Sequence, residues 1–207
     1  MIKDYENNGI MLPLVEHFYS IQGEGFHTGK AAYFIRIGGC DVGCSWCDAK
    51  FTWNARYHEM THIDEILRSV RISGADSVVV TGGEPLMYDL DCLCSELGKM
   101  KIKTYLETSG SHHLTGRWDW ICLSPKKNSP PLDNICSLAG ELKVIIETAD
   151  DFTWAETYRA KVPAGCKLFL QPEWSSYKTI MPELVKYIKK HTEWSISLQS
   201  HKFMGIP

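Results

Sequence analysis

Short β-rich apolar runs alternate with helical patterns along most of the 207 residues of this chain. The apolar runs predict strands at residues 31–37, 77–81, 101–107, 118–123, 142–147, 167–170 and 194–198. The segments between them predict helices at residues 61–72, 90–100, 151–160 and 180–191. This alternation indicates a parallel sheet covered by helices. A closed eightfold barrel takes about 250 residues. We therefore expect one α/β domain over residues 1–207, folded as a partial, open barrel of about six strands.

Two of the predicted helices carry signals that place their first turns. Thr61 is expected as the N-cap of the first helix, with Asp64 at the capping-box position three residues later. Pro182 is expected in the first turn of the 180–191 helix, where its missing N–H group costs nothing.

The residues that can carry chemistry follow the predicted strands. They lie in residues 38–48, 82–85, 124–126 and 171–172. In parallel α/β folds, ligand sites form at the carboxyl ends of the strands. The sequence therefore predicts a single site at that edge of the sheet.

Composition excludes several classes of protein. The 22 basic and 25 acidic residues give a formal charge of −3, without the basic stripe that nucleic-acid binding requires. No apolar run approaches the roughly 18 residues that cross a bilayer, and the first twenty residues lack the apolar stretch of a secretory signal. We therefore expect a cytoplasmic protein with no nucleic-acid and no membrane partner. The eight cysteines are expected to be free thiols.

Three of the cysteines are close together in a glycine-containing loop. Cys40, Cys44 and Cys47 have the spacing Cys-x3-Cys-x2-Cys. Thiolates are soft ligands that suit iron–sulfur clusters or zinc. Three thiolates can hold three irons of a four-iron cubane and leave the fourth iron open to a small molecule. The alternatives are a zinc loop with a fourth ligand such as His58, and a redox pair of Cys44 and Cys47.

Other polar residues near the predicted strands suit a small, polar ligand. Gln22 and Glu24 offer an amide and a carboxylate to a pterin-like or purine-like edge, although an ordinary polar loop would also contain them. Arg36 can hold a carboxylate through two hydrogen bonds, the alternative being a surface strand charge. Gly82 and Gly83 allow a ligand to approach the backbone, or form a simple tight turn. For the tail after the last strand, the alternative to a role in the site is a frayed terminus.

The cysteine loop, with Trp46 before its last cysteine, resembles the signature of the radical S-adenosylmethionine (SAM) superfamily. That superfamily folds as a full or partial (βα) barrel. Further segments occur in the same order over nearly the whole chain and resemble the 7-carboxy-7-deazaguanine synthase family. They are IQGEG at 21–25, TGGEP at 81–85, Glu107-Thr108, SPK at 124–126, ELK at 141–143, Gln171-Pro172, and SLQSHK with the final GIP.

This resemblance implies an enzyme with a [4Fe-4S] cluster and SAM as cofactors. The cluster would reduce SAM to give a 5′-deoxyadenosyl radical, which takes hydrogen from C6 of 6-carboxy-5,6,7,8-tetrahydropterin. Ring contraction and loss of ammonia then give 7-carboxy-7-deazaguanine, a precursor of queuosine and related 7-deazapurines, and SAM is regenerated. The resemblance also implies a homodimer and a reductant such as flavodoxin or ferredoxin. Two other functions share part of the pattern: a glycyl-radical-activating enzyme, against which the QGEG and GIP segments argue, and a zinc-stabilised binding module.

The resemblance assigns roles residue by residue. The expected cluster ligands are Cys40, Cys44 and Cys47. The expected SAM contacts are Trp46, Cys47, Asp48, Gly83, Ser124, Pro125, Lys126, Gln171, Pro172, Glu173 and Trp174. The expected substrate contacts are Ile21, Gln22, Gly23, Glu24, Arg36, Thr81 and the carboxylate of Pro207, which requires an untagged C-terminus.

One position departs from the pattern of the family. Many relatives have Thr or Ser directly after the Cys-Asp pair, where the hydroxyl binds Mg²⁺ beside the substrate carboxylate. Here the residue is Ala49, and a methyl group cannot bind a cation that prefers oxygen ligands. We therefore expect weak Mg²⁺ dependence, or Mg²⁺ binding through Asp48 and water.

Overall fold

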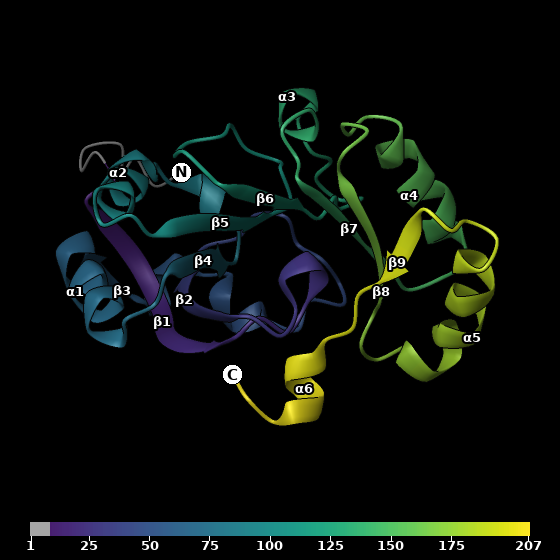
Figure 1. The fold of residues 1–207 in the computed structure, drawn as a ribbon, viewed down its shortest axis with the longest axis horizontal. Helices are drawn as coiled ribbons and strands as arrows, with labels where there is room; N and C mark the ends of the chain where they lie inside the picture. The colour runs from purple at the N-terminus through teal and green to yellow at the C-terminus, as the bar shows by residue number, and fades with distance from the viewer. Residues whose placement is uncertain (1–8) are drawn as a thin grey trace.

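The computed structural model describes residues 9–207, and the first eight residues of the predicted domain lie outside this range. Within it, the strands form one sheet in the order β3-β1-β2-β4-β5-β6-β7-β8-β9. The strands are β1 (Met11–Ile21), β2 (Ala31–Ile37), β3 (Glu59–His62), β4 (Ser77–Gly82), β5 (Lys103–Thr108), β6 (Trp120–Leu123), β7 (Glu141–Ile146), β8 (Lys167–Pro172) and β9 (Trp194–Ile196). The sheet curves around an open interior (Figure 1).

All neighbouring strands from β2 to β9 are parallel, which confirms the predicted α/β fold with an open barrel. The seven predicted strands correspond to β2 and β4–β9. The sequence prediction missed β1 and β3, which pair antiparallel at one end of the sheet. Neither strand alternates clearly between apolar and polar residues: β1 contains Pro13 and is partly exposed on both faces, and β3 has four residues, none of them buried.

The α-helices are α1 (Ile63–Ser73), α2 (Asp91–Lys99), α3 (Asp133–Cys136), α4 (Asp150–Arg159), α5 (Tyr177–Ile188) and α6 (Ser200–Met204). The longer helices α1, α2, α4 and α5 pack on the outside of the curved sheet, whereas α6 lies in the C-terminal segment (Figure 1). α1 contacts β1, β2 and β3, α2 contacts β5, α4 contacts β7, and α5 contacts β8 and β9. Within residues 9–207, no helix combines the length and the apolar character needed to cross a membrane.

Two predicted helix starts were wrong. Thr61 belongs to β3, where it pairs with Leu12, and the N-cap of α1 is His62, whose Nδ1 accepts a hydrogen bond from Asp64 N at 3.2 Å. Strand pairing with β1 therefore holds the chain extended for one residue more than the capping signal predicts. Pro182 lies inside α5 rather than in its first turn, because the helix begins at Tyr177.

Each parallel strand sends alternate side chains to opposite faces of the sheet. One set, which includes Ile35, Val80 and Leu106, packs with the helices in the main hydrophobic core. The other set faces the interior of the open barrel. At its base is a small apolar cluster of Ala32, Phe34 and Val79, with Phe18 and Tyr105 packed against it. Beyond this base, polar residues occupy the same face toward the carboxyl ends of the strands.

The β1–β2 connection and the C-terminal segment lie side by side, although more than 170 residues separate them. Ser200 donates from its backbone N (2.9 Å) and its hydroxyl (2.8 Å) to Gly23 O. Gly25 N donates to Ser197 Oγ at 2.9 Å. In Figure 1 the tail leaves β9 and runs back beneath the first strands, with α6 between. The tail is therefore folded against the barrel and is not a frayed terminus.

Candidate active site

A cavity of about 370 Å³ lies at the carboxyl ends of the parallel strands, where the sequence places the site. Its volume suits a small molecule, since such sites span roughly 300–1,000 Å³. Nearly all of the predicted site residues line it. They are Ile21, Gln22, Gly23, Glu24, Arg36, Cys40, Cys44, Trp46, Cys47, Asp48, Ala49, Thr81, Gly83, Ser124, Lys126, Gln171, Pro172, Glu173, Trp174 and Pro207. Among the predicted residues, Pro125 does not line the cavity.

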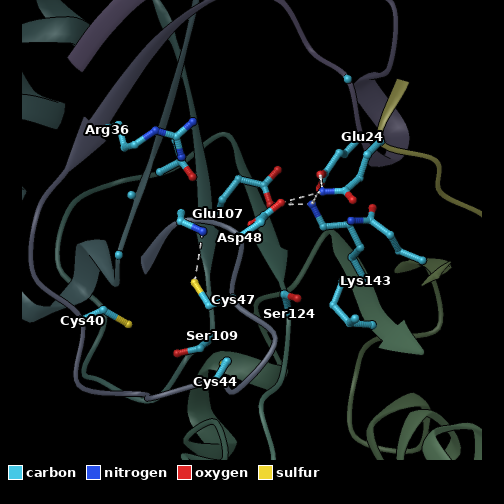
Figure 2. A pocket seen from close by; sticks show the side chains of 18 of the residues that line it. Glu24, Arg36, Cys40, Cys44, Cys47, Asp48, Glu107, Ser109, Ser124 and Lys143 are labelled. Carbon is cyan, nitrogen blue, oxygen red and sulfur yellow. Dashed lines mark hydrogen bonds and ion pairs between the residues drawn. The ribbon is translucent and has the colours of Figure 1, made fainter. Parts of the chain in front are cut away.

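The three clustered cysteines lie on the loop after β2, and each is a free, partly exposed thiol on the cavity wall (Figure 2). Close backbone packing holds this loop against the end of β4. A Cβ atom at Gly83 would lie 2.1 Å from Gly39 O and 2.8 Å from Cys40 Cβ, so only glycine fits there. Gly39 has φ +102°, a conformation that favours glycine. The glycines thus allow the thiols to open onto the cavity.

The spacing of the thiols favours a group larger than a single ion. In a tetrahedral zinc site, Zn–S bonds of about 2.3 Å bring thiolates to about 3.8 Å from one another. Within residues 9–207, the cysteine thiols do not form a set whose ligand atoms all lie within 4.8 Å, and His58 Nε2 instead contacts Phe51 O at 3.0 Å. A cubane spreads its ligands over several irons, so three free thiols that do not converge on one point suit a [4Fe-4S] cluster better than a zinc ion.

Lys126 supplies positive charge beside the thiols. Its Nζ donates to Ser124 O at 2.6 Å and lies 5.8 Å from the centre of the Trp46 ring. Burial raises the pKa of Cys40 and Cys44, and at Cys44 the charge of Lys126 acts in the opposite direction. A nearby ammonium group favours thiolates and other anionic sulfur ligands.

Both carboxylate oxygens of Glu84, in the TGGEP segment, accept hydrogen bonds from groups of the protein. One oxygen accepts from Thr108 Oγ1 (2.6 Å) and Leu86 N (3.1 Å), and the other from Ser109 N (2.8 Å) and Ser109 Oγ (2.5 Å). The residue is only 1% exposed. These bonds tie the end of β4 to the end of β5, so Glu84 fixes the backbone of the glycine pair beside it.

A buried ammonium and two carboxylates lie together on the wall of the cavity (Figure 2). Lys143 Nζ lies 2.6 Å from Glu24 Oε2 and 2.9 Å from Glu107 Oε2. Burial acts to raise the pKa of Glu24, but Lys143 and a hydrogen bond from Gln199 bring it to about 2. Burial acts to lower the pKa of Lys143, but the acidic groups around it raise it well above its usual value. The predicted Glu24 is therefore ionised and held in one orientation.

Arg36 extends from β2 into the same cavity and is partly buried. Its Nε donates to Glu16 Oε1 at 2.7 Å, which fixes one edge of the guanidinium. Arg36 pairs in register with Thr81 on β4, so both residues reach the cavity from adjacent strands. An anchored guanidinium suits the binding of a carboxylate.

The C-terminal segment supplies one wall of the cavity. Gln199 Nε2 donates to Glu24 Oε1 at 3.0 Å and to Asp48 Oδ2 at 3.2 Å. Pro207 lies at the cavity, and its O accepts from Ser20 Oγ at 3.4 Å. The tail therefore links the β1–β2 connection to the cysteine loop.

The sequence-based assignment of site residues left out several polar members of the cavity. They are Glu84, Glu107, Thr108, Ser109, Lys143, Gln199 and His201. Lys143 carried a signal, since it is a charged residue within the largely apolar strand ELKVII. Glu107 lies in the mixed strand KTYLET, where its charge gives no such signal. Glu84, Thr108, Gln199 and His201 lie in segments that carry the family resemblance, but the resemblance gave them no role. Their approach to the cavity depends on contacts between distant segments.

Comparisons with known proteins agree with this geometry. The model of the radical SAM superfamily matches residues 34–123. The 7-carboxy-7-deazaguanine synthase of Flavobacterium psychrophilum is 51% identical, over 96% of this chain and 94% of its own length. The enzyme of the same name from Synechocystis is 45% identical, over 95% and 94%. The crystal structure of QueE from Escherichia coli matches with a TM-score of 0.81 and 28% identity, covering 93% of this chain and 95% of that one. This chain belongs to the 7-carboxy-7-deazaguanine synthase family of radical SAM enzymes, which act in 7-deazapurine biosynthesis.

Proposed function

We propose that this enzyme converts 6-carboxy-5,6,7,8-tetrahydropterin to 7-carboxy-7-deazaguanine with loss of ammonia. The observation that carries the proposal is one cavity in which three free thiols face a charged pocket of Glu24, Lys143 and Arg36. A pterin carries donors and acceptors on one edge and, in this substrate, a carboxylate at the other end. The pocket offers complementary groups for both ends.

The three thiolates would hold a [4Fe-4S] cluster, which supplies the electron that generates a radical from SAM. Residues of the chain bind and orient the substrate. Glu24 and Gln22 accept and donate hydrogen bonds to the pterin edge, and Arg36 binds the carboxylate. Lys143 keeps Glu24 ionised and fixes its position. Gln199 and the C-terminal segment form one wall of the cavity and orient Glu24.

Several finer points belong to the same proposal. The remaining SAM contacts are the residues assigned by resemblance, among which Trp174 and Lys126 lie on the cavity wall. We infer a one-electron reductant such as flavodoxin or ferredoxin, a homodimer, and a cytoplasmic location, which is a reducing compartment that keeps thiols free. The proposal treats residues 1–207 as one functional domain, supported by the single sheet that runs through the described part of the chain.

The test is anaerobic reconstitution with iron and sulfide, followed by incubation with SAM, dithionite and the pterin. We expect mass spectrometry to show a product that has lost ammonia and has the mass of 7-carboxy-7-deazaguanine, and no product when SAM is left out. Brown, cluster-loaded protein that leaves the pterin unchanged would contradict the proposal. That outcome would favour the glycyl-radical-activating alternative, whereas colourless, zinc-loaded protein would favour the binding module.

A further inference from the structure

Asp48, the residue after the last clustered cysteine, already has a cationic partner from the protein. Lys202 Nζ, on α6, lies 2.6 Å from Asp48 Oδ2. The same oxygen accepts from Gln199 Nε2 at 3.2 Å. The side chain of Lys202 is 20% exposed, so this ammonium is mostly enclosed.

The surroundings of the Lys202 ammonium resemble a cation-binding site. Besides Asp48, its Nζ donates to Gln199 Oε1 at 3.0 Å and lies 4.6 Å from the centre of the Trp174 ring. Two oxygens and an aromatic face therefore surround one positive charge. Ring contacts of Phe203 with Trp174 and Tyr177 hold α6 in the position that this arrangement requires.

The same residues do not fit a Mg²⁺ ion. Mg²⁺ requires near-octahedral oxygen coordination, and the Ala49 position next to Asp48 has no side-chain oxygen. An ion that bound Asp48 would also have to displace Lys202 from its carboxylate or lie against a like charge, which is unfavourable. The chain thus has no side-chain oxygen at position 49, and Lys202 already binds the carboxylate of Asp48, which would be the other ligand.

We propose that the Lys202 ammonium is the resident cation beside Asp48 and that this enzyme uses it in place of a divalent metal. Lys202 is then a positioning residue that keeps Asp48 and Gln199 in place, and through Gln199 it reaches the carboxylate of Glu24. The proposal decides between the two expectations drawn from Ala49: it predicts Mg²⁺-independent turnover, without a metal bound through Asp48 and water. Its activity readout rests on the proposed function, whereas its metal-binding readout does not.

The direct test titrates Mn²⁺ into cluster-reconstituted protein, with the cluster in its oxidised, EPR-silent state, and measures free Mn²⁺ by EPR. We expect the wild-type protein to bind no saturable Mn²⁺. The Ala49→Thr/Lys202→Met variant should bind one equivalent and lose it when Asp48→Asn is added. Lys190→Met removes an exposed lysine and is the matched control, expected to behave as wild type.

Two results of the Mn²⁺ titration would overturn the proposal. One is a wild-type protein that binds one equivalent of Mn²⁺ and loses it in Asp48→Asn. The other is failure of the folded Ala49→Thr/Lys202→Met variant to bind Mn²⁺, because Lys202 would then not be what excludes the ion. Circular dichroism confirms that each variant is folded.

Turnover gives a second readout. Wild-type product formation should be the same in metal-depleted buffer and in buffer with Mg²⁺, whereas the Ala49→Thr/Lys202→Met variant should lose its activity without Mg²⁺. Loss of wild-type activity on metal depletion would also overturn the proposal. Absence of the deazaguanine product in every sample would instead refute the proposed function and leave the Mn²⁺ result intact.

Discussion

Lys143 on β7 lies 2.6 Å from Glu24, which is 119 residues earlier in the chain, and the ion pair is mostly buried. Replacing Lys143 by Met would leave Glu24 and Glu107 as neighbouring carboxylates without a counter-charge. We expect Lys143→Met to lower the free energy of unfolding by about 3–5 kcal/mol, the usual cost of breaking a buried pair. Urea unfolding measures this, and adding Glu24→Gln should restore part of the loss.

The matched control is Lys99→Met. Lys99 and Glu96 also lie 2.6 Å apart, but both are on the surface of α2, where water screens the charges. We expect no measurable change in this variant. Equal unfolding midpoints for Lys143→Met and Lys99→Met would show that the buried pair does not stabilise the fold.

The cysteines give a second prediction. Cys40→Ala, Cys44→Ala and Cys47→Ala should each lose bound iron, the broad absorbance near about 400 nm that thiolate-bound iron gives, and product formation. Cys92→Ala removes a half-buried free thiol outside the cavity and should retain all three. Iron analysis and absorbance of anaerobically reconstituted protein provide the measurement. An iron-loaded, active Cys44→Ala variant would be inconsistent with cluster ligation by this loop.

Glu84 is predicted to act through structure rather than through direct contact with SAM. Glu84→Gln replaces one acceptor oxygen by a donor, which leaves buried donors of Ser109 or Leu86 without a partner. We expect a loss of about 1–3 kcal/mol in the free energy of unfolding, measured by thermal and urea denaturation. Weaker SAM binding with unchanged stability would instead indicate that the carboxylate itself contacts SAM.

Gly23 is predicted to control docking of the C-terminal segment. A Cβ atom there would lie 2.3 Å from His201 Nδ1, so Gly23→Ala should push His201 and α6 away from the cavity. We expect a higher KM for the pterin, with the unfolding midpoint close to that of the wild type, and faster hydrogen exchange in residues 199–207. Gly165→Ala, where a Cβ atom would meet nothing within 4 Å, is the control. An unchanged KM in Gly23→Ala would argue against a role for the tail in binding.

Glu141 should make stability depend on pH near neutrality. It lies behind the β1–β2 connection, where Oε2 accepts from Phe26 N and Trp120 Nε1, while Oε1 is buried without a partner. Burial raises the pKa of Glu141 from 4.5 to about 7, although Lys143 acts in the opposite direction. The folded protein therefore binds a proton more tightly than the unfolded chain, and this contribution to stability is lost as the pH rises from about 4.5 to about 7.

Other carboxylates also titrate, so the measurement is the difference between wild type and Glu141→Gln. We expect the variant to gain stability relative to wild type across that pH range, by roughly 3 kcal/mol at its upper end, taking about 1.4 kcal/mol per pKa unit. Urea unfolding at a series of pH values provides the data. A constant difference from pH 4.5 to 7 would show that Glu141 does not titrate in this range.

Much of the fold could be predicted from the sequence because the parallel strands are buried, short and bounded by clear turns. The same logic failed for β1 and β3, because most of their residues are half-exposed or exposed and show no alternation. Helix starts depended on tertiary contacts: pairing of Thr61 with Leu12 overrode a good capping signal. Sequence patterns therefore predicted the buried parallel strands reliably, but they failed for the two antiparallel strands and for the start of α1.

Many residues that line the site could be predicted from the sequence, but the contacts between them could not. Spacing and position after strands identified the cysteine loop and the glycine pair. No local pattern reveals that Lys143 joins Glu24 to Glu107, that Arg36 is anchored by Glu16, or that Lys202 meets Asp48. These pairs join segments that are adjacent only after folding.

The contact between Ser200 and Gly23 also bears on the order of events during synthesis. On a ribosome, residues 40–47 emerge well before residues 197–207. During that interval the C-terminal segment is not yet present beside the cysteine loop. Joining such distant segments is slow, because a long chain must lose entropy before the contact forms. A transcript that stopped just before Ser197 would still encode every strand of the sheet, yet its product would lack one wall of the pocket.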